Sequence, residues 1–246
     1  MSKQFWAVII AVVLVFIAIF AFGQKSTGNS SGSASGKLTQ HVEGLGKDHV
    51  TLVEYGDYQC PYCGQYSSIV KQVEAEYNTQ ITFQFRNFPL VSIHQNAFAG
   101  ARAAEAASLQ GKFWQMHDLL YEQNQIYYNS NESVATWIGA SNPQTVFDQY
   151  AKQLGLNLTK FNQDYGSNGV NQTINDDMAE GNKLNIDATP TFILDGKQIN
   201  VGESAADFQT LINAAIEKQA GKASSTPATT STGSTSQTQS SSKKSQ

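Results

Sequence analysis

Residues Val50 to Cys63, with the sequence VTLVEYGDYQCPYC, contain both cysteines of the 246-residue chain. Val50 to Tyr55 consists mainly of β-branched and aromatic residues with apolar side chains on both faces, which predicts a strand buried on both sides. After the turn Gly56 to Gln59 and the cysteine pair, residues 64–78 carry apolar side chains at helical spacing, so we expect a helix. The cysteines therefore stand where a buried strand turns into a helix, and this position is suited to redox chemistry.

Cys60 and Pro61 define the start of this helix. Proline is favoured at the first helical position, because the N–H that it lacks would have no partner there, and Cys60 then becomes the N-cap. Its sulfur would accept hydrogen bonds from the backbone N–H groups of Tyr62 and Cys63 and would face the positive end of the helix dipole. Both effects stabilise a thiolate, so we expect a lowered pKa for Cys60. Cys60 is the candidate nucleophile and Cys63 the resolving thiol. A thiolate of low pKa is also a good leaving group, which predicts a ready disulfide donor.

A structural disulfide and a metal site are the alternatives for this pair. A structural disulfide gains most from closing a long loop, whereas this ring would enclose only Pro61 and Tyr62. A zinc site needs two more ligands at suitable spacing, and the four histidines are scattered along the chain. The sequence therefore predicts no metal and no other cofactor, and we expect a disulfide here that is made and broken.

The rest of the domain repeats strand and helix patterns on either side of a helical block. Ile81 to Phe85 alternates and completes a βαβ unit, for which a right-handed crossover is expected. From about residue 94 to about 185 the patterns are helical only. Residues 191–201 predict a β-hairpin with its turn at Asp195-Gly196, and 205–218 predict an amphipathic helix. The fold class is therefore α/β, with βαβ and ββα portions separated by an all-helical insertion. The candidate helices of the insertion cover 96–110, 112–123, 143–154, 158–165 and 170–183.

The two ends of the chain lack the composition of a folded domain. Phe5 to Phe22 is an unbroken apolar run, long enough at about 1.5 Å per residue to approach a hydrocarbon core of about 30 Å. Residues 1–23 are therefore expected to be a transmembrane anchor, with a cleaved signal peptide as the alternative, and either one predicts export. Residues 24–37 are typical of a flexible Gly/Ser linker, and 222–246 of a disordered Ser/Thr/Gln-rich tail. Residues 38–221 remain as one globular domain.

Charge and composition limit the partners. The formal net charge is −4 at pH 7 and the sequence contains no basic run in its domain, which argues against nucleic-acid binding. Lys3 favours a cytoplasmic amino terminus. We therefore expect a single-pass cell-membrane protein that contacts the lipid bilayer through its N-terminal helix and carries an extracytoplasmic catalytic domain.

Four motifs are informative in combination. They are Glu54 to Cys63 (EYGDYQCPYC), Arg86 to Leu90 with His94, Gly111 to Trp114 with Met116 to Asp118, and Thr189 to Thr191. Together they lie within about residues 47–220, and this part of the chain resembles the DsbA-like family of thiol:disulfide oxidoreductases. The resemblance implies a thioredoxin fold with a helical insertion between its two halves, in a membrane-tethered member of the family.

The resemblance also implies roles outside the cysteine pair. Pro190 would be the cis-proline beside the cysteines, since X–Pro is the peptide bond that adopts cis at low cost. Thr189 before it would offer its backbone to an extended substrate strand. Glu54 would be a buried acid of raised pKa that takes the proton as Cys63 attacks a mixed disulfide. The family's lysine partner for this acid lies on the next strand, and Ile81 to Phe85 contains no lysine.

Several of these residues have simpler interpretations. Glu54 could instead be a solvated strand-end glutamate or part of a structural ion pair. Tyr62 is expected to tune the redox potential, with space filling as the alternative. His94 and His117 are interpreted as cap or core histidines. The pair Asp176-Asp177 is interpreted as a surface helix start, although calcium contact is an alternative.

The function expected from these features is disulfide donation to exported cysteine-containing proteins, with a membrane quinone-linked protein as the candidate reoxidant. A reductase or isomerase with the same site is one alternative, because threonine before the proline, here Thr189, occurs in many reducing or shuffling relatives of the family. A non-enzymatic tethered chaperone or binding domain that uses the groove beside Pro190 is the other alternative.

Overall fold

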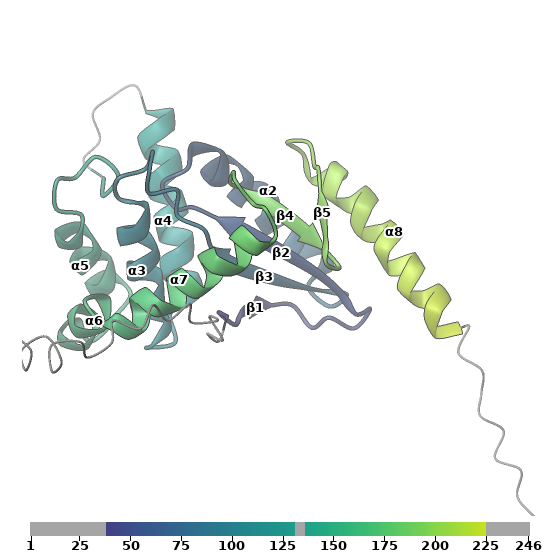
Figure 1. Cartoon of the computed structure of the whole chain (residues 1–246), viewed down its shortest axis with the longest axis horizontal. Coiled ribbons are helices and arrows are strands. Elements are labelled where there is room, and N and C mark those ends of the chain that lie inside the picture. The colour runs from purple at the N-terminus through teal and green to yellow at the C-terminus, as the bar shows by residue number, and fades with distance from the viewer. Residues whose placement is uncertain (1–37, 131–135, 225–246) are drawn as a thin grey trace, which may run out of the picture. The chain divides into compact units, whose positions relative to one another are not determined.

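The computed structural model describes residues 38–130 and 136–224 (Figure 1). The expected anchor in residues 1–23, the linker over 24–37 and the tail beyond residue 224 lie outside the described residues. Among the residues described, no helix is both long enough and apolar enough to cross a membrane. The strands are β1 (His41–Glu43), β2 (Val50–Gly56), β3 (Ile81–Asn87), β4 (Thr191–Leu194) and β5 (Lys197–Ile199). The helices are α2 (Pro61–Tyr77), α3 (Ala97–Ser108), α4 (Phe113–Asn129), α5 (Gln144–Gln153), α6 (Leu158–Tyr165), α7 (Asn168–Lys183) and α8 (Ala205–Ser224).

These strands form one five-stranded sheet in the order β1-β3-β2-β4-β5. β2 and β3 are parallel and are joined by α2, whereas β1, β4 and β5 pair antiparallel with their neighbours. β2 lies at the centre, so that Glu54 is paired with Phe85 of β3 and with Phe192 of β4. The predicted βαβ and ββα portions therefore share one sheet, and helices α3 to α7 separate them along the chain. This arrangement confirms the expected fold class.

Two apolar clusters cover the two faces of β2. Val50 and Leu52 belong to the larger cluster, together with apolar residues of α2, α4 and α8. Tyr55 points to the other face, where it packs with Phe88 and Ile186. Figure 1 shows α7 crossing the strands on one side of the sheet, and its contacts with β3 confirm that it lies against them. The interpretation of β2 as a strand buried on both faces is confirmed.

Some boundaries differ from the sequence-based expectation. β1 was not predicted, because three residues are too few for an alternating pattern to be recognised. α4 extends to Asn129 and not to about Gln123. α8 extends to Ser224, beyond the domain boundary predicted at residue 221. β5 ends at Ile199 and not at Val201. None of these differences moves the cysteine pair.

Candidate active site

The cysteine pair lies at the junction of β2 and α2. Cys60 is the N-cap of α2, with φ −67° and ψ 125°, and Pro61 follows it in the first turn. Cys60 is 4% exposed and Cys63 is 0% exposed. Both are free thiols, so the structure holds the site in its dithiol form. The predicted helix start at Cys60 and Pro61 is confirmed.

The two thiols differ in acidity. The pKa of Cys60 is lowered from 9.0 to about 6, and the hydrogen bond from the Cys63 thiol is the largest cause. Burial opposes this shift. The backbone amides of Cys63 and Tyr62 and the Thr189 hydroxyl lower the pKa further. The Cys60 side chain accepts no capping hydrogen bond, so the prediction of such a bond is wrong. The amides of Tyr62 and Cys63 therefore act on the Cys60 sulfur at longer range. Burial raises the pKa of Cys63 well above 9.0, and Cys60 adds to this effect. At neutral pH Cys60 is therefore a thiolate and Cys63 a thiol.

Asp57 organises the turn between β2 and α2. Its carboxylate accepts hydrogen bonds from the Gln59 N–H at 2.7 Å and from the Leu90 N–H at 2.9 Å. Its own N–H donates to Cys63 Sγ at 3.4 Å. His94 Nδ1 lies 2.7 Å from Asp57 Oδ2, and this hydrogen bond raises the pKa of His94. His94 thus helps to hold the turn through the Asp57 carboxylate.

Side chains of α4 hold the backbone of the same turn, which the sequence did not predict. Asn124 Nδ2 donates to the carbonyl groups of Tyr58 at 2.9 Å and Cys60 at 3.0 Å. The Tyr128 hydroxyl donates to the Gln59 carbonyl at 3.1 Å. Consecutive carbonyl groups of the turn therefore accept hydrogen bonds from one helix of the insertion, which ties the insertion to the cysteine pair.

Gly64 allows α2 and α4 to approach each other at this point. A Cβ at Gly64 would lie 2.0 Å from Asn124 Oδ1, so a larger residue would force the two helices apart. Gln125 Nε2 also donates to the Gly64 carbonyl at 2.6 Å. The glycine directly after the second cysteine is the one signal in the sequence that could have indicated this contact.

The Thr189–Pro190 segment lies beside Cys60. Its peptide bond is cis, as the resemblance implied, and the Cys60 thiol donates to the Thr189 carbonyl at 3.3 Å. Thr189 Oγ1 is buried without a hydrogen-bond partner among the described residues. A groove of about 410 Å³ opens here, lined by Tyr62, Tyr66, Pro190 and residues of β4 and β5. Tyr62 is 57% exposed, so it forms part of the rim of the site.

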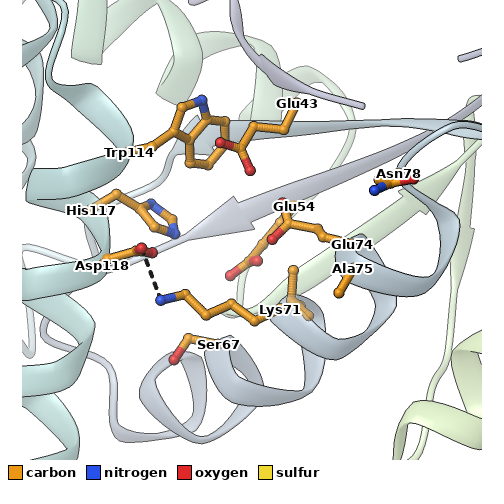
Figure 2. Close-up of a pocket in the computed structure, with 11 residues that line it drawn as sticks. Glu43, Glu54, Ser67, Lys71, Glu74, Ala75, Asn78, Trp114, His117 and Asp118 are labelled. Atoms are coloured by element: carbon orange, nitrogen blue, oxygen red, sulfur yellow. Dashed lines mark ion pairs between the residues drawn. The ribbon is translucent and has the colours of Figure 1, made fainter. Parts of the chain in front are cut away.

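Glu54 lies on β2 beneath the cysteine pair. It is 1% exposed, which rules out the solvated strand-end alternative. Burial raises its pKa to about 8, and the charges of Glu74 and Cys60 add to this effect. A pocket of about 410 Å³ reaches Glu54 (Figure 2). Lys71 and Asp118, which line this pocket, form an ion pair at 2.9 Å. The lysine that lines this pocket therefore lies on α2, whereas the family's lysine partner for this acid lies on the strand after it.

His117 is a core histidine, as predicted. Its Nδ1 lies 3.1 Å from the Tyr58 hydroxyl, and its ring contacts the rings of Phe85, Trp114 and Tyr121. Burial lowers its pKa to about 3. His117 is therefore neutral at physiological pH and contributes no charge to the site.

The interpretation of Asp176-Asp177 as a surface helix start is wrong. Both residues are buried inside α7, and Asp177 is 0% exposed. Asp177 accepts hydrogen bonds from the backbone N–H groups of Thr39 and Asn87, and Arg86 lies 3.6 Å away. This carboxylate therefore fastens the beginning of the domain to β3 and α7. In the part of the chain that the structure describes, no group of three or more His, Cys, Asp or Glu residues is placed to hold a metal ion.

Fold and site together define a thioredoxin-fold domain with a CxxC dithiol centre beside a cis-proline. The comparisons with known proteins agree: the sequence model described as thioredoxin matches residues 37–214. The chain belongs to this family. A thioredoxin-like oxidoreductase from Silicibacter pomeroyi DSS-3 is similar in structure, with 26% identity and a TM-score of 0.56 over 72% of this chain and 91% of that one.

Two further solved structures extend the likeness. BdbD from Bacillus subtilis is 23% identical, with a TM-score of 0.59 over 72% of this chain and 93% of that one. The α-DsbA1 protein of Wolbachia pipientis is 18% identical, with a TM-score of 0.60 over 76% of this chain and 96% of that one. At these identities the likeness shows the fold. The thioredoxin fold with its helical insertion is thus confirmed.

Curated relatives match over a smaller share of their own length. A Na⁺/H⁺ antiporter NhaA 1 from Mycolicibacterium gilvum is 33% identical over 161 residues, which are 64% of this chain and 24% of that protein. An antiporter of the same name from Salinispora arenicola is 34% identical over 158 residues, 64% of this chain and 22% of that protein. The chain spans about a quarter of the length of these relatives.

Proposed function

We propose that this chain is an extracytoplasmic thiol:disulfide oxidoreductase that donates the Cys60–Cys63 disulfide to exported proteins. The observation that carries the proposal is the contrast between the two thiols, because the pKa of Cys60 is lowered to about 6 and that of Cys63 is raised well above 9.0. A stabilised Cys60 thiolate favours the dithiol form of the protein. Each pKa unit is worth about 1.4 kcal/mol, or about 30 mV for a two-electron couple. The disulfide form is correspondingly more oxidising.

The exchange proceeds in two steps. A substrate thiolate attacks Cys60 Sγ, the Cys60–Cys63 bond breaks, and Cys63 leaves as a thiolate that takes up a proton. A second substrate thiolate then attacks the substrate sulfur of the mixed disulfide, and Cys60 leaves as a stable thiolate. The substrate is oxidised by two electrons and the cysteine pair is reduced by two. A membrane quinone-linked protein is the proposed class of reoxidant, and it returns the pair to the disulfide by the reverse exchange.

The substrates proposed are exported, cysteine-containing polypeptides in an extended conformation. The groove beside Thr189 and Pro190 supports this choice, since it is lined by Tyr62, Tyr66 and Phe192 next to the reactive sulfur. In the disulfide form Cys60 carries no proton, so the Thr189 carbonyl, to which the protonated Cys60 thiol donates, can accept a hydrogen bond from a bound peptide. The apolar run Phe5 to Phe22 supports a membrane anchor that holds the domain outside the cytoplasm.

The redox potential of the Cys60–Cys63 pair, measured against glutathione, tests the direction. We expect a value well above that of cytosolic thioredoxin, at about −270 mV, and rapid oxidation of a reduced peptide with two cysteines. A potential as low as that of thioredoxin would remove the oxidase role. If Cys60→Ser oxidised or bound clients as well as the unaltered chain, the alternative of a non-enzymatic binding domain would be favoured.

An isomerase or reductase with the same site is the second candidate. Its motivation is Thr189 before the cis-proline, because threonine at this position occurs in many reducing or shuffling relatives of the family that the sequence resembles. Reactivation of scrambled ribonuclease separates the two functions. An isomerase restores activity to the scrambled protein, whereas a pure oxidase does not accelerate the reshuffling.

A further inference from the structure

The pocket behind the cysteine pair contains two buried carboxylate oxygens without partners. Glu54 Oε1 and Glu74 Oε1 are both covered, and neither has a hydrogen-bond partner among the described residues. Both residues line the same pocket of about 410 Å³ (Figure 2). Buried polar atoms in native proteins nearly always have a partner, either a protein group or water. A polar pocket of this size has room for several water molecules, at about 30 Å³ each.

The pocket connects Glu54 to solvent. Its charged and titratable lining groups come from four elements: Glu43 on β1, Glu54 on β2, Lys71 and Glu74 on α2, and His117 and Asp118 on α4. The side chains of Lys71 and Asp118 are 53% and 46% exposed, so the pocket opens where they pair. On the neighbouring strands, Glu54 is paired with Phe85 and Phe192, which bring no charge. The route from Glu54 outward is therefore polar and lies on α2 and α4.

The proposed exchange needs such a route. Cys63 is 0% exposed, and it takes up a proton when it leaves as a thiolate and loses one when the pair is reoxidised. During the mixed-disulfide stage a polypeptide is joined to Cys60 and covers the groove beside Pro190. The proton then has to reach Cys63 from another side.

We propose that Glu74 is a second proton-transfer residue, which exchanges protons between Glu54 and solvent through the pocket that both line. This inference rests on the proposed function. Neutral Glu54 gives its proton to the Cys63 thiolate, the Glu54 carboxylate takes one from Glu74 through pocket water, and Glu74 takes one from solvent. Reoxidation runs the same transfers in reverse, and no electrons move in them.

Two observations support Glu74 over the other groups of the pocket. Burial raises the pKa of both Glu54 and Glu74 to about 8, and transfer between groups of matched pKa near the working pH is efficient in both directions. Both side chains line the same pocket (Figure 2), and the negative charge of Glu74 is the second cause of the raised Glu54 pKa. Lys71 is occupied by its ion pair with Asp118.

Glu74→Gln in the full chain tests the proposal. We expect the step that protonates Cys63 to slow by roughly tenfold in dilute buffer, which is less than the loss of a direct acid or base, with a larger solvent isotope effect. Imidazole, a small proton carrier, should restore the rate. Glu74→Asp should retain part of it. Glu76→Gln is the matched control, because Glu76 is exposed on the same helix and its carboxylate accepts a hydrogen bond from Gln209.

Two outcomes overturn the relay: a Glu74→Gln rate equal to that of Glu76→Gln, or a slow variant that imidazole does not restore. Carboxyl NMR of labelled glutamate supplies a readout that needs no catalysis, since loss of the Glu74 charge must lower the pKa of Glu54. An unchanged Glu54 pKa also contradicts the proposal. Failure of the unaltered protein to exchange disulfides would instead remove the proposed function, and would leave the NMR result standing.

Discussion

Two cavities of about the same volume, roughly 410 Å³ each, flank the active-site helix, and their linings differ. The groove beside Pro190 is lined mainly by aromatic, aliphatic and neutral polar side chains, with Glu203 as its acidic residue. The pocket behind Glu54 is lined by four carboxylates, with Lys71 and His117. α2 contributes to both, with Tyr62 and Tyr66 on one side and Lys71 and Glu74 on the other.

This difference separates two tasks of one reaction. A groove with an exposed aromatic ring at Tyr62 and the Thr189 carbonyl beside the reactive sulfur is suited to an extended peptide. A pocket with buried carboxyl groups of raised pKa is suited to proton exchange. Cys60 faces the groove through the Thr189 carbonyl, and Cys63 is coupled to Glu54. The two sulfurs therefore belong to different sides of the site. Their acidities differ because the Cys63 thiol lowers the pKa of Cys60, whereas burial raises the pKa of Cys63.

The largest effect is expected at the sulfurs themselves. Cys60→Ser should reduce oxidation of a cysteine peptide to the background rate, because the groove side loses its electrophilic sulfur. In Cys63→Ser the Cys60 thiolate should attack the disulfide of an oxidised peptide, from which the other sulfur leaves as a thiolate, and the resulting mixed disulfide should accumulate, since no resolving thiol remains. Gel electrophoresis without reductant measures this adduct. Accumulation in Cys60→Ser as well would contradict the division of roles.

Glu54→Gln should slow the Cys63-dependent step by about 10²-fold or more at neutral pH. The pKa of Cys60 should stay close to its value in the unaltered protein. The pH dependence of the rate should also lose its inflection near pH 8, which corresponds to the raised pKa of Glu54. Stopped-flow measurements over the neutral to alkaline range test both expectations. An unchanged pH profile would show that the back pocket takes no part in proton exchange.

Glu54→Gln should slow the reaction but raise the stability of the folded protein at alkaline pH. The pKa of Glu54 is raised from 4.5 to about 8, so the folded protein keeps this proton between these values while the unfolded chain has lost it. The unaltered protein therefore loses stability as pH rises from about 4.5 through 8, by on the order of a few kcal/mol. Glu54→Gln removes this loss, and denaturant unfolding at low and high pH measures it. If the difference in unfolding free energy between Glu54→Gln and the unaltered protein did not vary with pH, the raised pKa of Glu54 would be contradicted.

Asn124→Ala should lower the free energy of unfolding by about 1–3 kcal/mol, because the carbonyl groups of Tyr58 and Cys60 each lose the hydrogen bond that Asn124 donates. The pKa of Cys60 should rise, since the start of α2 is then held less firmly against the sulfur. The ultraviolet absorbance of the thiolate as a function of pH measures this shift. Glu122→Ala, on an exposed position of the same helix, is the control and should leave both quantities unchanged.

The sequence was sufficient for the local parts of this site and insufficient for the contacts across elements. Pro61 after Cys60 indicates the helix start because the signal lies within two residues. Thr189 and Pro190 needed the family resemblance, since no local pattern connects them to a cysteine far away in the sequence. Asn124 and Glu74 carried no signal, because a polar residue on a helix gives no indication of which element it will face.

Buried charge was the other point at which sequence reasoning failed. Asp177 was interpreted as exposed, since acidic residues are seldom fully buried without a partner. Its partners are backbone N–H groups and Arg86, which come from β3 and from the residues before β1. The partners of a buried acid are supplied by tertiary structure, so periodicity along one helix cannot identify them.

The smallest predicted effect concerns the groove side. The Tyr66 hydroxyl donates to the Val201 carbonyl at 3.1 Å, and its ring contacts Phe192, so it ties α2 to the far wall of the groove. Tyr66→Phe keeps the ring and removes this one hydrogen bond, at a cost of about 0.5–1.5 kcal/mol. Loss of this bond should loosen the groove wall, so we expect the KM for a cysteine peptide to rise a few-fold while kcat and the pH profile stay the same. Tyr77→Phe is the matched control. Tyr77 lies on α2 like Tyr66, its hydroxyl donates to Asn213, and it lines neither of the two cavities. A change in kcat for Tyr66→Phe, or an equal change in KM for Tyr77→Phe, would contradict the assignment of peptide binding to the groove and proton exchange to the pocket.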